Sequence, residues 1–202
     1  MKHPTTRAVF DYWNRRRGSR PAPERGEIEP ADIRQALGDT FMLAADFIDT
    51  WRFRLAGTRI CALFCREIKG EAFAELWAAA NRKAIEELAA VVEEERVGAV
   101  AGLIGRSAEG HVAELEMLLL PLAHSGHARI RALGVLAPTV SLYWLGVTPV
   151  EELELMTLRH IEAEQKTRSG PRFVRAAESS RLRHGFVVYS GGREIPPGER
   201  TG

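Results

Sequence analysis

One helix-like stretch between two groups of strand-like stretches constrains the fold of this chain more than any other feature. In residues 71–96, apolar side chains recur at helical spacing opposite charged ones, which predicts a long helix with one buried face. Residues 41–47 and 51–57 precede it as a predicted hairpin, and the second run alternates apolar and basic residues. Three further antiparallel strands are expected between residues 97 and 138. This order of strands and helices predicts an α+β fold. We expect a five-stranded antiparallel sheet with helices inserted between strands two and three.

A separate helix is predicted at the N-terminus. Thr5 or Thr6 is expected to act as its N-cap, and Gly18 to end it. A Pro-rich linker and a short helix near residues 30–37 follow.

Three regions are therefore predicted: an N-terminal helical extension with a Pro-rich linker (1–38), a sheet-and-helix domain (39–162), and a basic, largely mobile C-terminal tail (163–202). Residues 143–161 fit either a strand or a helix by spacing, and we favour a strand as far as about His160, followed by a basic helix. The end of the tail is rich in Gly, Pro and charged residues, which cannot bury enough apolar surface to offset the entropy of ordering.

The sequence FRLAGTRICALFCREIKG spans residues 53–70, and FAELW ends at Trp77. Together with the pair Tyr12-Trp13 and the RPAP linker, it resembles the small stand-alone PAS-domain proteins of alphaproteobacteria over roughly residues 8–160. The resemblance implies a sensory or interaction module without an attached output domain, whose signal would leave by binding a partner protein. The family usually has glycine at the position of Cys65, so the sequence leaves open whether the backbone there is left-handed.

The resemblance also implies a pocket for a small ligand between the sheet and the long helix. Its expected lining is Phe53, Leu55, Phe64, Phe73, Trp77, Leu103, Leu115 and Met117. The same residues would equally form a solid core.

Phe10, Tyr12 and Trp13 place a large aromatic surface on the first helix. Burying such side chains contributes about 1.5–3 kcal/mol each, so they must pack against something. In PAS modules an N-terminal helix lies across the sheet or exchanges with a second copy. We therefore predict a homodimer in which Trp13 is buried on its own sheet or on that of its neighbour.

The net charge of +1 conceals two basic ends. Residues 1–25 and residues 165–185 each carry a net charge of +5, so the small total is weak evidence against anionic partners. Arg15, Arg16 and Arg17 are candidates for phosphate binding, because guanidinium groups match phosphate oxygens. Solvated arginines that aid solubility explain them as well, and nucleic acid is not expected as a partner because no reading motif is present.

Neither a secreted disulfide scaffold nor a membrane protein is expected. The chain has two cysteines, its start lacks the apolar core of a signal peptide, and no segment approaches the roughly 18 charge-free apolar residues of a spanning helix. We expect a cytoplasmic protein without membrane insertion.

The sequence predicts no cofactor and no metal site. The segment around Cys65 is similar to that of flavin-binding, light-sensing PAS domains, but residues 97–139 contain no Asn or Gln to bind the isoalloxazine edge. Residues 71–96 contain no histidine for haem. His111, His124 and His127 are more simply explained as solvated turn residues than as metal ligands.

No enzyme motif is present either, because there is no G-x-S-x-G elbow and no P-loop lysine. The preferred hypothesis is a non-catalytic sensory or regulatory module that acts through protein contacts and is gated by a small ligand. The alternative is a nucleotide-responsive regulator that binds phosphate through its basic ends.

Overall fold

The structure is a computed structural model of the 202-residue chain, and it describes residues 1–46, 50–123, 130–161, 181–183 and 186–188. The predicted basic helix after His160 and most of the predicted tail lie outside the described residues.

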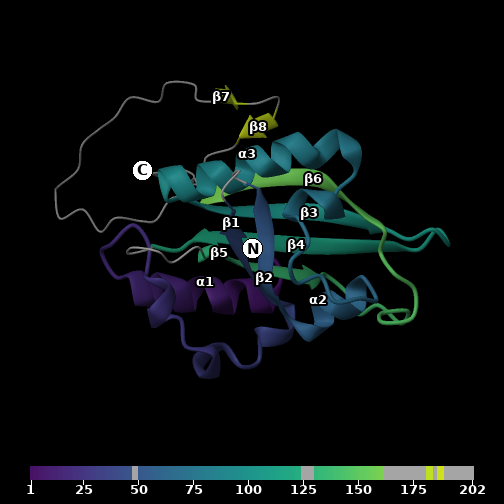
Figure 1. Ribbon diagram of the computed structural model, residues 1–202, viewed down its shortest axis with the longest axis horizontal. Coiled ribbons are helices and arrows are strands. Elements are labelled where there is room, and N and C mark those ends of the chain that lie inside the picture. Colours follow the sequence, from purple (N-terminus) through teal and green to yellow (C-terminus); the bar gives the residue numbers. More distant parts are fainter. Residues whose placement is uncertain (47–49, 124–129, 162–180, 184–185, 189–202) are drawn as a thin grey trace, which may run out of the picture.

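A six-stranded antiparallel sheet forms the centre of the molecule (Figure 1). Its strands are β1 (Thr40–Ala45), β2 (Trp51–Ala56), β3 (Gly98–Arg106), β4 (Val112–Pro121), β5 (Ile130–Pro138) and β6 (Glu152–Ile161). Their order across the sheet is β2-β1-β5-β4-β3-β6. The α+β architecture and the helices between strands two and three are confirmed, and β6, the strand favoured for residues up to about His160, adds a sixth strand beside β3.

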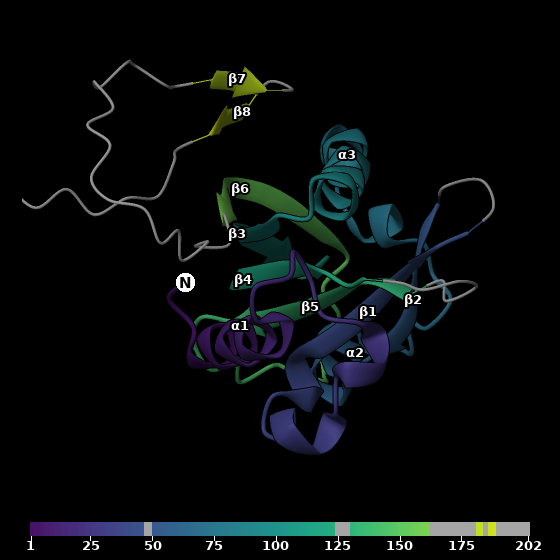
Figure 2. The same ribbon diagram turned by 90° about the vertical axis from the view of Figure 1, so that its left-hand side faces the viewer.

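Helices cover both faces of this sheet. The α-helices are α1 (Pro4–Arg17), α2 (Thr58–Leu63) and α3 (Ala79–Glu95), and the 3-10 helices are η1 (Arg25–Glu27), η2 (Pro30–Ile33), η3 (Leu37–Asp39) and η4 (Phe73–Leu76). Figure 2 shows α1 and α3 on opposite faces of the sheet. A short pair, β7 (Arg181–Arg183) and β8 (Phe186–Val188), is antiparallel, and β8 contacts β6.

The single helix predicted for residues 71–96 is wrong, because the chain is extended at Trp77, between η4 and α3. Trp77 forms a bridge to Leu153, and the next amide, Ala78 N–H, donates to the Leu153 carbonyl at 2.9 Å. Pairing with β6 requires extended backbone, so it interrupts the helical spacing of the apolar residues.

The predicted cap of α1 is also wrong. His3 is the N-cap, and its Nδ1 accepts from the Thr5 amide at 3.2 Å. Pro4 occupies the first turn, where its fixed φ suits a helix and its missing N–H removes no bond. This places the threonines inside the helix, where Thr6 is buried. The predicted end at Gly18 is confirmed, with φ of 60°.

From Leu115 onward, strand β4 is buried on both faces, so the molecule has a core on each side of the sheet. Leu115, Met117 and Leu119 point into the core beneath α2 and α3. Leu118 and Leu120 point into a second core beneath α1. Because both faces are apolar, the sequence of this strand does not alternate as a half-exposed strand would.

Phe41 of β1 lies directly over its cross-strand partner Gly134 of β5. A Cβ atom at residue 134 would lie 2.1 Å from the Phe41 ring, closer than any real contact. The glycine therefore leaves the space that this ring occupies.

We predict that Gly134→Ala lowers the free energy of unfolding by about 1–3 kcal/mol, the usual cost of overpacking a core. Urea unfolding of the whole chain measures it. Gly26→Ala is the matched control, because a Cβ there meets nothing within 4 Å, and a similar effect in both variants would contradict the packing argument.

Candidate functional site

The core beneath α3 is built around four aromatic rings. Phe41, Phe53 and Phe73 contact one another with ring centroids 5.5–5.9 Å apart, and Trp77 meets Phe73 edge-on at 5.8 Å. These rings connect β1 and β2 to η4, and all four are buried. Offset and edge-on contacts of this kind add to the stabilisation that burial gives.

Seven of the eight residues predicted to line a pocket come together in this core. Phe53, Phe64, Phe73, Trp77, Leu103, Leu115 and Met117 are each no more than 2% exposed.

Leu55 does not join them and is 42% exposed. The β1–β2 register shifts between Met42 and Leu43, whose partners are Leu55 and Phe53, so Arg54 is an extra residue in β2. Such a bulge breaks the alternation on which the prediction depended.

One polar group in this core is unsatisfied. The indole N–H of Trp77 is buried and has no hydrogen-bond acceptor within the described part of the chain. Leaving a buried donor unpaired costs about 1–3 kcal/mol. An acceptor brought in by a small molecule would recover that free energy.

The opposite face of the sheet is covered by α1. Trp13 is 1% exposed, and its Nε1 donates to the Pro121 carbonyl at 2.8 Å. Phe10 stacks on Trp13, and the Tyr12 hydroxyl accepts from the Glu29 amide at 2.8 Å. The aromatic residues predicted to contact a dimer partner are thus used within one chain.

Glu116 of β4 holds the other end of α1. Its carboxylate accepts from the Lys2 amide at 2.6 Å and from the His3 amide at 3.0 Å. Burial acts to raise the pKa of Glu116, but these two backbone hydrogen bonds, the Thr6 side chain and the charge of the N-terminus together outweigh it, and the pKa is lowered from its ordinary value of 4.5. The helix is therefore fastened by a charged contact at its start and by Trp13 near its end.

A family model described as PAS domain matches residues 1–137, which is more than half of the chain. The chain belongs to the PAS domain family. Among solved structures, it is similar to the PAS domain of the protein from Colwellia psychrerythraea, with 16% identity and a TM-score of 0.37 over 55% of this chain and 97% of that chain. The curated proteins contain no match. The predicted PAS membership is confirmed, and the narrower likeness to alphaproteobacterial members stays a prediction.

In this PAS domain the turn after α2 keeps a left-handed backbone without glycine. Cys65 has φ of 50° and is exposed, with its Sγ 3.5 Å from the Ala62 carbonyl. Its thiol therefore lies outside the aromatic core.

The three candidate phosphate-binding arginines are in different environments. Arg16 pairs with Asp32 at 2.5 Å and lies over the Tyr12 ring. Arg17 is buried against Trp13, and Arg15 is exposed. Arg15 and Arg16 border a depression of about 440 Å³ together with Tyr12 and Asp32. The guanidinium groups of Arg16 and Arg17 already have partners within the chain. Phosphate binding stays an untested prediction.

The described residues contain no cluster of three or more His, Cys, Asp or Glu side chains able to hold a metal ion. His111 stacks on Trp144, whereas His124 and His127 lie outside the described residues. None of the described helices is long and apolar enough to cross a bilayer.

Glu116 was not singled out from the sequence, although one signal was available. It directly precedes the apolar run of residues 117–121 that ends β4, and a carboxylate in such a place is rarely buried without a structural partner.

We predict that Glu116→Gln weakens the attachment of α1 by about 1–2 kcal/mol, because hydrogen bonds to a charged acceptor are replaced by weaker neutral ones. The folded pKa lies below 4.5, so the contribution is complete above about pH 4.5 and is lost as the pH falls through the folded pKa. Hydrogen exchange of the α1 amides, followed as a function of pH, measures how firmly the helix is attached.

Glu114→Gln is the control, since Glu114 is exposed on the same strand. Equal exchange in the two variants at neutral pH would show that Glu116 does not fasten the helix.

Proposed function

We propose that this PAS domain is a non-catalytic cytoplasmic regulatory module in which a small ligand beneath α3 controls whether α1 stays on the sheet. The observation that carries the proposal is the double burial of β4, which gives the two cores one shared strand. A displacement of Met117 by a ligand would move Leu118, its neighbour on the opposite face. Protein interiors are close-packed, so such shifts are transmitted rather than absorbed.

The ligand proposed is a largely apolar molecule with one hydrogen-bond acceptor. The aromatic core offers apolar contacts, and within this core the Trp77 N–H is a buried donor for which the described part of the chain supplies no acceptor. An acceptor there would be bound in a site of low dielectric, where a hydrogen bond is strongest.

The output proposed is a protein contact made by the face that α1 leaves. That face includes Val100, Leu118, Leu120, Leu133 and Val135, all buried beneath the helix. A second copy is the simplest partner, because exchange of identical helices rebuilds the same contacts in a homodimer. The aromatic residues of α1 would then pack in the same way on their own sheet in the monomer and on the partner's sheet in the dimer.

Native mass spectrometry of the protein taken directly from cells tests the ligand. We expect a retained small molecule on the wild-type chain and a loss of at least about tenfold in its occupancy in Trp77→Phe, equivalent to about 1.4 kcal/mol. Trp51→Phe is the control, because Trp51 is a buried indole of the same core. Wild-type protein that carries no adduct would contradict ligand gating.

Analytical ultracentrifugation tests the proposed contact between two copies. We expect Glu116→Gln to raise the fraction of dimer over that of the wild type and of Glu114→Gln, because a loosened α1 exchanges more readily. A chain that stays monomeric in all three forms at high concentration would contradict helix exchange.

A further inference from the structure

The turn between β5 and β6 exposes an unusual amount of apolar surface. Val140, Tyr143 and Val147 are 63%, 86% and 79% exposed, and Val112 at the start of β4 is 48% exposed. Single exposed apolar residues are common, whereas a larger exposed apolar patch marks an interaction site. We call these four residues the loop patch.

The turn that carries the loop patch is fastened to the domain. The Gly146 amide donates to the Ala62 carbonyl at 3.1 Å, and the Val150 amide donates to the Leu63 carbonyl at 2.8 Å. Trp144, between the exposed residues, is buried in the core beneath α3. The exposed side chains are therefore carried by a backbone that is hydrogen-bonded to α2.

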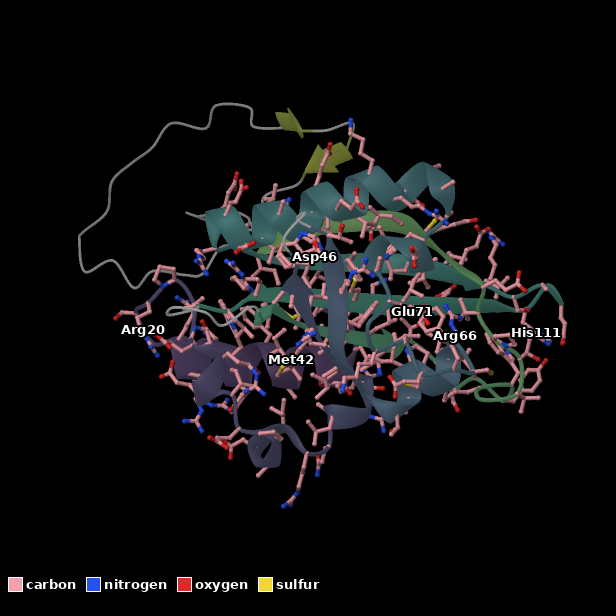
Figure 3. The ribbon with its side chains drawn as sticks, in the orientation of Figure 1. Arg20, Met42, Asp46, Arg66, Glu71 and His111 are labelled. Atoms are coloured by element: carbon pink, nitrogen blue, oxygen red, sulfur yellow. The ribbon has the colours of Figure 1, made fainter. Side chains whose placement is uncertain are left out.

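His111 joins the β3–β4 turn to the loop patch. Its ring stacks on Trp144 at 5.3 Å and meets the exposed Tyr143 ring edge-on at 6.0 Å. Figure 3 labels His111 at the end of the sheet, far from Arg20 in the segment after α1. The loop patch thus has a preformed aromatic edge.

The two chain segments that carry the loop patch are acidic. Residues 105–115 and 139–154 contain five glutamates and one arginine, a net charge of −4. That arginine, Arg106, is paired with Glu154 at 2.8 Å. The exposed carboxylates of Glu151 and Glu152 meet no further Lys or Arg within these two segments. Glu109 is also exposed, but it lies 3.6 Å from His111 Nε2 and accepts from the Thr148 hydroxyl at 3.2 Å.

We propose that the loop patch binds a basic segment of a partner protein in which Arg or Lys alternates with large apolar side chains. The apolar side chains would cover Val140 and Val147, and the cations would pair with the glutamates. An arginine would also stack on the exposed Tyr143 ring. The proposal goes beyond the proposed function, because the loop patch is a contact separate from the face beneath α1.

Selection of random 16-residue peptides displayed on phage against the full chain tests this proposal. We expect the enriched peptides to be basic and to contain large apolar residues. A synthetic peptide of the consensus should bind Tyr143→Ser and the double variant Glu109→Lys/Glu151→Lys at least about tenfold more weakly than the wild type. Its affinity should also fall as sodium chloride rises from about 50 to about 500 mM.

Matched controls lie elsewhere on the surface. Met156→Ser removes a side chain that is 60% exposed on β6, and Glu94→Lys reverses an exposed charge on α3. Both should bind the peptide as the wild type does. No enrichment, acidic consensus peptides, or equal binding by all variants would overturn the proposal.

A second copy is the competing occupant. If Tyr143→Ser abolishes a dimer that Glu116→Gln leaves intact, the loop patch is a contact between copies and the basic partner is excluded. The two proposals can fail separately. If the peptide binds but neither a retained ligand nor helix exchange is found, the proposed function is contradicted and the loop-patch proposal is not.

Discussion

The burial of β4 on both faces is the constraint on which the rest of the structure depends. A strand without a solvent face needs a covering layer on each side, and α3 alone can supply only one. The segment before β1 supplies the other, which is why α1 packs on β4 and β5. The aromatic residues of α1 and the carboxylate of Glu116 are consequences of this requirement, since both attach the second layer to the central strands.

Local patterns in the sequence predicted the order of the elements well, and the departures occur where long-range contacts override them. The hairpin of β1 and β2 followed from alternation at Trp51 and Phe53, yet the bulge at Arg54 turned Leu55 outward. Helical spacing continued through Trp77, but pairing with Leu153, far along the chain, required extended backbone there. A register shift or a distant bridge leaves no periodic signal, so spacing alone could not reveal either.

The sequence predicted which apolar residues gather in the core beneath α3, but it did not predict the polar contacts. Seven of eight lining residues came from apolar spacing, because burial is what such spacing reports. The unpaired Trp77 N–H and the hydrogen bonds of Glu116 depend on which backbone groups face them. These are set by packing between segments that lie far apart in the sequence, such as Lys2 and Glu116. Likewise, the three arginines look equivalent in sequence, but only the fold distinguishes buried Arg17 from exposed Arg15.

The bond from Trp13 to the Pro121 carbonyl joins residues separated by 108 positions. During synthesis α1 leaves the ribosome early, while the strands that bury it follow only after most of the domain has been made. At about 5–20 residues per second, the aromatic surface of α1 stays uncovered for roughly 5–20 s in each nascent chain.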